Sequence, residues 1–100
     1  MEVTKTLEGT KLTICVSGRL NTGTSPKLEA VLKDSLDGVE TLVFDLSNLD
    51  YISSAGLRAI LSAQKLMNRQ GSMQVRNVKP EVYDVFVMTG FVDFLNVEQS

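Results

Sequence analysis

The chain has 100 residues, and its 12 acidic and 10 basic side chains give a formal net charge of −2. This length fits one domain, residues 1–100, and a content of 43% hydrophobic and 22% charged residues is that of an ordinary globular protein. The charge argues against direct binding of nucleic acid, because nucleic-acid-binding domains take much of their affinity from a basic surface.

The chain has no histidine and one cysteine, Cys15. A histidine phosphocarrier, a serine–histidine triad, a cysteine–histidine nucleophile, most zinc sites and an internal disulfide are therefore excluded within it. The aspartates Asp45, Asp50 and Asp93 do not have the spacing of a metal-ligand set. We expect no metal site, no cofactor and no enzyme activity. The N-terminus has no signal pattern, and no apolar run approaches the ~20 residues that cross a bilayer. We therefore expect a cytoplasmic protein without membrane insertion.

The patterns of apolar residues predict eight elements, because strands alternate with period two and helices carry a stripe at spacings of three and four. In chain order these are strands at residues 4–7 and 11–18, a helix at 26–36, a strand at 40–46, a helix ending near residue 69, a strand at 72–78, a helix at 80–88 and a strand at 91–97. This order predicts an α/β fold in which a mixed sheet of four to five strands packs against three main helices. Residues 45–50 are predicted to form a polar turn.

Several side chains receive individual predictions. Ser25 is a candidate N-cap of the first helix, with Pro26 at the first helical position. Cys15 is expected to be a structural or half-buried thiol, since no base accompanies it. The apolar residues near the C-terminus are expected to belong to the core: Val85, Phe86, Phe91 and Phe94.

The second helix begins at a pair of serines, Ser53 and Ser54. One interpretation is structural, because serine oxygens commonly cap the free N–H groups of a helix start. The other is phosphorylation, because backbone amides and the helix dipole favour a phosphate at this position. Arg58 follows Ser54 by four residues and either meets a phosphate or an acidic group of a partner, or is a solvated arginine. Gly56 either permits a close approach by a strand or partner backbone, or is tolerated near a frayed helix end.

Three segments resemble the motifs of STAS domains, and in particular those of the bacterial anti-sigma factor antagonists. The first is residues 51–57, Tyr-Ile-Ser-Ser-Ala-Gly-Leu, following Val-Phe-Asp-Leu-Ser at 43–47. The second is residues 16–21, Val-Ser-Gly-Arg-Leu-Asn, which are similar to the family's G-x-L-D segment. The third is Met-Thr-Gly-Phe at 88–91, which is similar to its M-S/T-G-L/F segment. The resemblance spans nearly the whole chain and implies the STAS-domain fold.

The resemblance implies a partner-switching function. Unphosphorylated members of that family bind an anti-sigma factor that is also a serine kinase, and so regulate transcription indirectly. The kinase phosphorylates a serine at the start of the second helix, which ends the complex, and a serine phosphatase reverses the modification. The family motif D-S-S/T-G-L places that serine at Ser54, with Ser53 as second choice. This sequence departs from the family pattern at two positions, because Ser53 and Asn21 stand where the family commonly has aspartate.

We assign partner binding to a loop after the second strand and to the start of the second helix. The residues are Asn21, Thr22, Ser53, Ser54, Ala55, Gly56, Leu57 and Arg58. An alternative function is a STAS-domain subunit or scaffold of another complex, such as the cytoplasmic partner of a lipid ABC transporter. The sequence leaves the sigma factor, the kinase and the oligomeric state open.

Overall fold

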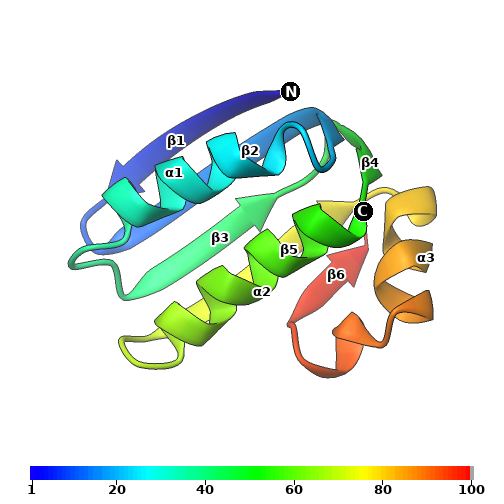
Figure 1. Ribbon diagram of the computed structural model, residues 1–100. Coiled ribbons are helices and arrows are strands. Elements are labelled where there is room, and N and C mark those ends of the chain that lie inside the picture. The colour runs from blue at the N-terminus through cyan, green and yellow to red at the C-terminus, as the bar shows by residue number, and fades with distance from the viewer. Residues whose placement is uncertain (100) are drawn as a thin grey trace.

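The computed structural model describes residues 1–99. Six strands, three α-helices and one 3₁₀ helix follow one another along the chain (Figure 1). They are β1 (Glu2–Glu8), β2 (Lys11–Leu20), α1 (Ser25–Ser35), β3 (Thr41–Asp45), β4 (Leu49–Ile52), α2 (Ser54–Met67), β5 (Ser72–Val78), α3 (Pro80–Met88), η1 (Phe91–Asp93) and β6 (Val97–Gln99). The mixed α/β fold and its three helices are as predicted.

The strands form one sheet in the order β1-β2-β3-β5-β6. The β1–β2 pair is antiparallel, as the glycine-containing turn between them predicts, and the other pairs are parallel. Strand β4 lies off this path and pairs with the end of β2, beyond the point where β3 stops. Strand β2 is therefore shared, because residues 11–15 pair with β3 and residues 18–20 pair with β4.

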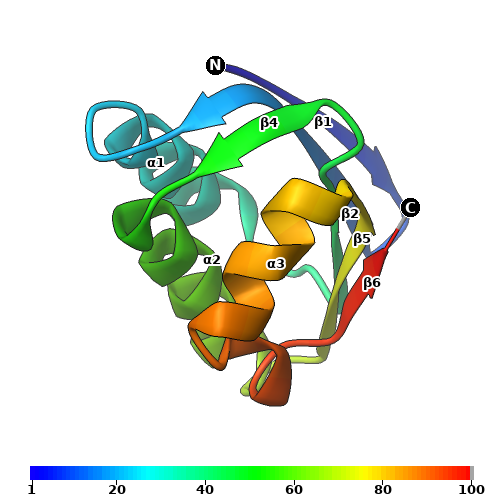
Figure 2. The same cartoon turned by 90° about the vertical axis from the view of Figure 1, so that its right-hand side faces the viewer.

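The helices lie on one side of the sheet (Figure 2). Side chains from the inward face of each strand meet apolar side chains of the helices in a single core, which includes Ile14, Phe44, Leu28, Ile60 and Phe86, each 0% exposed. Burying side chains of this size contributes roughly 1.5–3 kcal/mol each before conformational entropy is subtracted. Within residues 1–99, no helix covers the opposite face of the sheet.

The polar turn predicted over residues 45–50 is confirmed only at Ser47 and Asn48, because β4 begins at Leu49. The segment Leu49–Ile52 has buried residues at its two ends and exposed residues between them, so it lacks the alternation by which strands are recognised. It is held instead by parallel pairing with β2, from Gly18↔Leu49 to Leu20↔Ile52. The sheet consequently has six strands, one more than the range predicted.

The predicted last short strand exists, but it does not lie at residues 91–97. The 3₁₀ helix Phe91–Asp93 occupies the beginning of this segment, and β6 starts only at Val97. Phe86 is buried as expected, and Val85 and Phe91 are half-buried, but Phe94 is 69% exposed and does not belong to the core.

Two further side chains differ from expectation. Cys15 is exposed, because it lies on the face of β2 that no helix covers. Ser25 is the first residue of α1 and is buried, and the N-cap is Thr24. Pro26 lies in the first turn of α1, as predicted.

Candidate functional site

The paired ends of β2 and β4 position the start of α2. Leu20 and Ile52 are the last residues of the two strands and are opposite each other in register. The backbone N–H of Ser53 donates to the carbonyl of Leu20 at 2.9 Å, which ties the helix start to the end of β2. After Leu20 the chain turns into the loop that leads to α1. The sequence-predicted site residues in that loop and at the start of α2 therefore meet at one end of the molecule (Figure 2).

The two serines have different roles. Ser53 is the N-cap of α2, has extended backbone angles, and its Oγ accepts a hydrogen bond from the Gly56 N–H at 3.3 Å. Its side chain is half-buried. Ser54 is the first residue of the helix and is exposed, and its hydroxyl makes no hydrogen bond within residues 1–99. The capping interpretation therefore holds for Ser53, whereas the hydroxyl of Ser54 is uncommitted.

Gly56 lets the helix start approach the strand pair. A Cβ atom at this position would lie 2.7 Å from Leu20 Cγ and 3.0 Å from Ile52 Cγ1. The close approach by a strand, one of the two interpretations of this glycine, is therefore the correct one. Gly56 and Leu57 are buried, and Ala55 is half-buried. Gly56 and Leu57 therefore pack against the core and do not present a surface to a partner.

The side chain of Asn21 stabilises the loop between β2 and α1. Its side-chain Oδ1 accepts from the N–H groups of Gly23 and Thr24, each at 3.0 Å. The Thr24 hydroxyl in turn donates to the carbonyl of Arg19 at 2.8 Å. A carboxylate would offer the same acceptor atom, so asparagine preserves these contacts without adding negative charge. Asn21 is half-buried, and Thr22 is exposed at the loop surface.

Two arginines give this end of the molecule positive charge. Arg58 is exposed on α2, and no acidic residue occurs in the first turn of that helix. Arg19, on β2, is also exposed, and its guanidinium carbon lies 4.2 Å from the centroid of the Tyr51 ring. Neither arginine belongs to the two ion pairs found within residues 1–99, which are Arg76–Glu98 and Lys79–Asp50.

The Arg19–Tyr51 contact was not anticipated from the sequence. The two residues are partners in the β2–β4 register, so the contact depends on a strand that the sequence pattern does not reveal. A guanidinium held over an aromatic face is a common cation–π arrangement. Recognising β4 would have placed both side chains on the same face of the strand pair.

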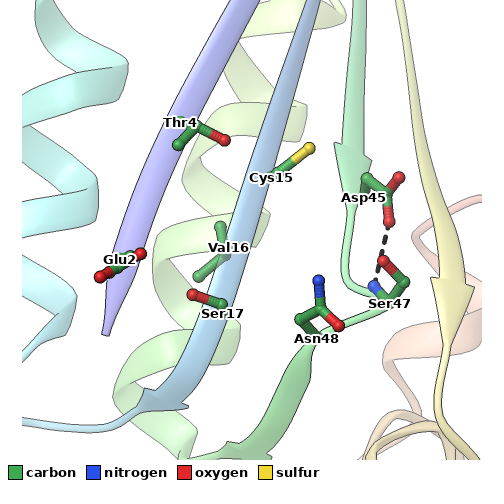
Figure 3. A pocket seen from close by; sticks show the side chains of 8 residues that line it. All are labelled: Glu2, Thr4, Cys15, Val16, Ser17, Asp45, Ser47 and Asn48. Carbon is green, nitrogen blue, oxygen red and sulfur yellow. Dashed lines mark hydrogen bonds between the residues drawn. The ribbon is translucent and has the colours of Figure 1, made fainter.

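A separate hollow of about 230 Å³ lies on the helix-free face of the sheet (Figure 3). Its lining residues are Glu2, Thr4, Cys15, Val16, Ser17, Asp45, Ser47 and Asn48. Partial burial raises the pKa of Asp45, but hydrogen bonds from the Ser47 N–H at 3.0 Å and from the side chains of Ser47 and Asn77 outweigh it, so the pKa lies below its ordinary value. No three metal-ligating side chains gather in a group anywhere in residues 1–99. The hollow therefore contains a carboxylate whose ionised form is favoured by its hydrogen bonds.

Comparison with known proteins places the chain in a family. The family model of the STAS domain matches residues 2–100. BtrV of Bordetella bronchiseptica, a candidate anti-sigma factor antagonist, is 41% identical over 91 residues, which cover 89% of this chain and 78% of BtrV. The chain therefore belongs to the STAS domain family, and it has a relative among the proteins named anti-sigma factor antagonists.

Solved structures agree on the fold. The crystal structure of an anti-sigma factor antagonist from Mycobacterium paratuberculosis superposes with a TM-score of 0.89 at 19% identity, covering 99% of this chain and 86% of that one. The Bacillus cell fate determinant SpoIIAA in its phosphorylated form gives 0.75 at 16% identity, covering 96% and 90%. At these identities the likeness establishes the STAS fold. In the part of the chain that the structure describes, no helix is both long and apolar enough to span a membrane.

Proposed function

We propose that this chain is an anti-sigma factor antagonist that binds, in its unphosphorylated form, an anti-sigma factor that is also a serine kinase. Phosphorylation of Ser54 by that kinase ends the complex, and a serine phosphatase restores the binding form. The protein thereby regulates transcription indirectly, in the cytoplasm and without catalysis of its own. The observation that carries the proposal is the exposed, uncommitted hydroxyl of Ser54 at the start of α2 in a STAS chain.

Ser54 is favoured over Ser53 because modification of the two hydroxyls has different structural consequences. Phosphorylation of Ser53 would place a bulky group on the half-buried oxygen that caps Gly56, whereas Ser54 carries no such bond. The Ser54 Oγ forms a bond to the γ-phosphorus of ATP, the bond to the β–γ bridging oxygen breaks, ADP leaves, and the hydroxyl proton passes to a base of the kinase. The chain supplies only the hydroxyl.

The loss of the complex follows from charge and solvation. A phosphoserine carries about −1.5 to −2 charges at pH 7, and burying it in a packed interface has a large desolvation cost. The first turn of α2 tolerates the group, because free N–H groups and the helix dipole favour an anion there. The domain therefore stays folded while the partner is rejected. A loss of ~3 kcal/mol would already weaken the complex more than a hundredfold.

The test is a pull-down from the native host with the wild-type chain, Ser54→Asp and Ser54→Ala side by side, followed by incubation of the captured complex with ATP. We expect the wild type to retain a kinase, Ser54→Asp to lose it, and phosphate to appear on Ser54 by mass spectrometry. Ser53→Ala is the matched control, and it should still be phosphorylated. Phosphate on Ser53 alone, or equal binding by wild type and Ser54→Asp, would contradict the proposal.

The same experiment separates this function from that of a STAS subunit of another assembly. Capture of permease or ATPase subunits of a transporter, with no kinase and with binding unaffected by Ser54→Asp, would favour the alternative. The 41% identity to BtrV supports the antagonist instead.

A further inference from the structure

Arg58 is placed where its side chain can reach a modified or unmodified Ser54. The two residues are four positions apart on α2, and both are exposed. Side chains at this spacing lie on the same helix face, about 5–6 Å apart at Cβ. Helical side chains also lean toward the N-terminus, so a residue covers the turn that precedes it. The guanidinium of Arg58 can therefore reach over the Ser54 hydroxyl.

The charge of Arg58 is not compensated in the unmodified protein. The first turn of α2 contains no acidic residue, and Arg58 has no carboxylate partner within residues 1–99. The backbone carbonyl of Arg58 accepts from the Ser62 hydroxyl at 2.9 Å, but that bond does not involve the guanidinium.

We propose that Arg58 is the internal counter-ion of phosphoserine at position 54, and that phosphorylation thereby withdraws Arg58 from the surface open to a partner. This inference rests on the proposed function for the identity of the modified serine. It adds a second effect of phosphorylation: the modification brings a negative charge and also removes a positive one. An acidic partner group that contacts Arg58 would lose its counterpart without any change in the backbone.

Other charged groups lie on the elements that contact α2. They are Lys11 and Arg19 on β2, Lys27, Glu29, Lys33 and Asp34 on α1, Asp50 on β4 with its partner Lys79, and Arg76 on β5. These groups and the helix dipole remain unchanged when Arg58 is replaced, so a comparison of variants isolates the contribution of Arg58.

The test uses protein in which phosphoserine is incorporated at position 54 during synthesis, so that no kinase or partner is needed. The second pKa of the phosphate, ordinarily near 6, is followed by phosphorus NMR in Arg58→Gln, Arg58→Lys and the unsubstituted background. We expect Arg58→Gln to raise the titration midpoint by about 0.2 to 0.4 pH unit, the value of a helical ion pair at this spacing. Arg58→Lys should restore most of the difference. Arg69→Gln is the matched control, because Arg69 is exposed beyond the end of α2.

A second measurement uses phenylglyoxal, which labels accessible arginines, with mass spectrometry of the digest. Labelling of Arg58 should fall at least twofold in the phosphoserine protein, while labelling of Arg69 stays the same. An Arg58→Gln midpoint no different from that of Arg69→Gln, or unchanged labelling of Arg58, would overturn the proposal. Neither result depends on whether a kinase modifies Ser54 in the cell, so this inference and the proposed function can fail separately.

Discussion

The substitution Gly56→Ala tests whether α2 is packed as closely against β2 and β4 as the structure indicates. Alanine is favoured over glycine inside a helix by up to ~1 kcal/mol. The added Cβ would, however, lie 2.7 Å from Cγ of Leu20, the branch point of a side chain that is 0% exposed. Overpacking of this kind costs about 1–3 kcal/mol. We therefore expect a net loss of about 1 kcal/mol, which for a chain of this size lowers Tm by about 4–8 °C.

Urea denaturation of four proteins measures the effect: wild type, Gly56→Ala, Leu20→Ala and the double variant. Leu20→Ala should itself destabilise by about 2–5 kcal/mol through the cavity it leaves. In that background the contact with Leu20 Cγ is gone and only the 3.0 Å approach to Ile52 Cγ1 remains, so Gly56→Ala should cost much less than in the wild type, with a coupling energy of about 1–2 kcal/mol. If Gly56→Ala stabilises the wild-type chain by the full helix-propensity gain, Gly56 does not approach Leu20 as closely as the structure indicates.

Three further predictions concern single contacts. Ser53→Ala should lower the free energy of unfolding by about 1 kcal/mol through loss of the cap, whereas Ser54→Ala should change it by less than about 0.5 kcal/mol. Urea titration measures both effects, and equal effects would count against Ser53 as the cap. Because the folded-state pKa of Asp45 is lowered, its contribution to stability is present above the unfolded pKa and is lost as pH falls through the folded one. Asp45→Asn should therefore destabilise at pH 7, and the difference should shrink as the pH falls toward the folded-state pKa. A pH-independent difference would refute this. Lys79→Met should lower the free energy of unfolding by at most about 1 kcal/mol, because the ion pair with Asp50 is largely exposed. The loss should be smaller at 1 M salt than at 0.05 M, and a loss unaffected by salt would indicate a packing contribution instead.

The sequence revealed those parts of the fold that depend on local patterns. The continuous apolar run of β3 predicted a central strand, and its residues Leu42, Val43 and Phe44 are all buried. Strand β4 was missed because it has four residues, begins among turn residues, and is stabilised by pairing with a distant strand. Periodicity reports which residues alternate, but it does not report which segment lies opposite them.

The exposure of Cys15 and Phe94 was missed for a related reason. Alternation along β2 separates two sets of side chains, yet it does not indicate that helices cover only one face of the sheet. Phe94 is apolar by composition, but it is the C-cap of the 3₁₀ helix and its side chain is exposed, whereas the side chain of the next residue, Leu95, is buried in the core. In the site, the spacing of the serines predicted both candidates, whereas their different hydrogen bonding required the three-dimensional arrangement.

The helix-free face of the sheet has a practical value for studying this protein. Cys15 is the only cysteine in the sequence, and it is exposed on that face. A maleimide dye would therefore attach at a single known position without any engineered residue. The label would lie on the opposite side of the sheet from α2, so association at the Ser54 end could be followed by fluorescence anisotropy in the native sequence.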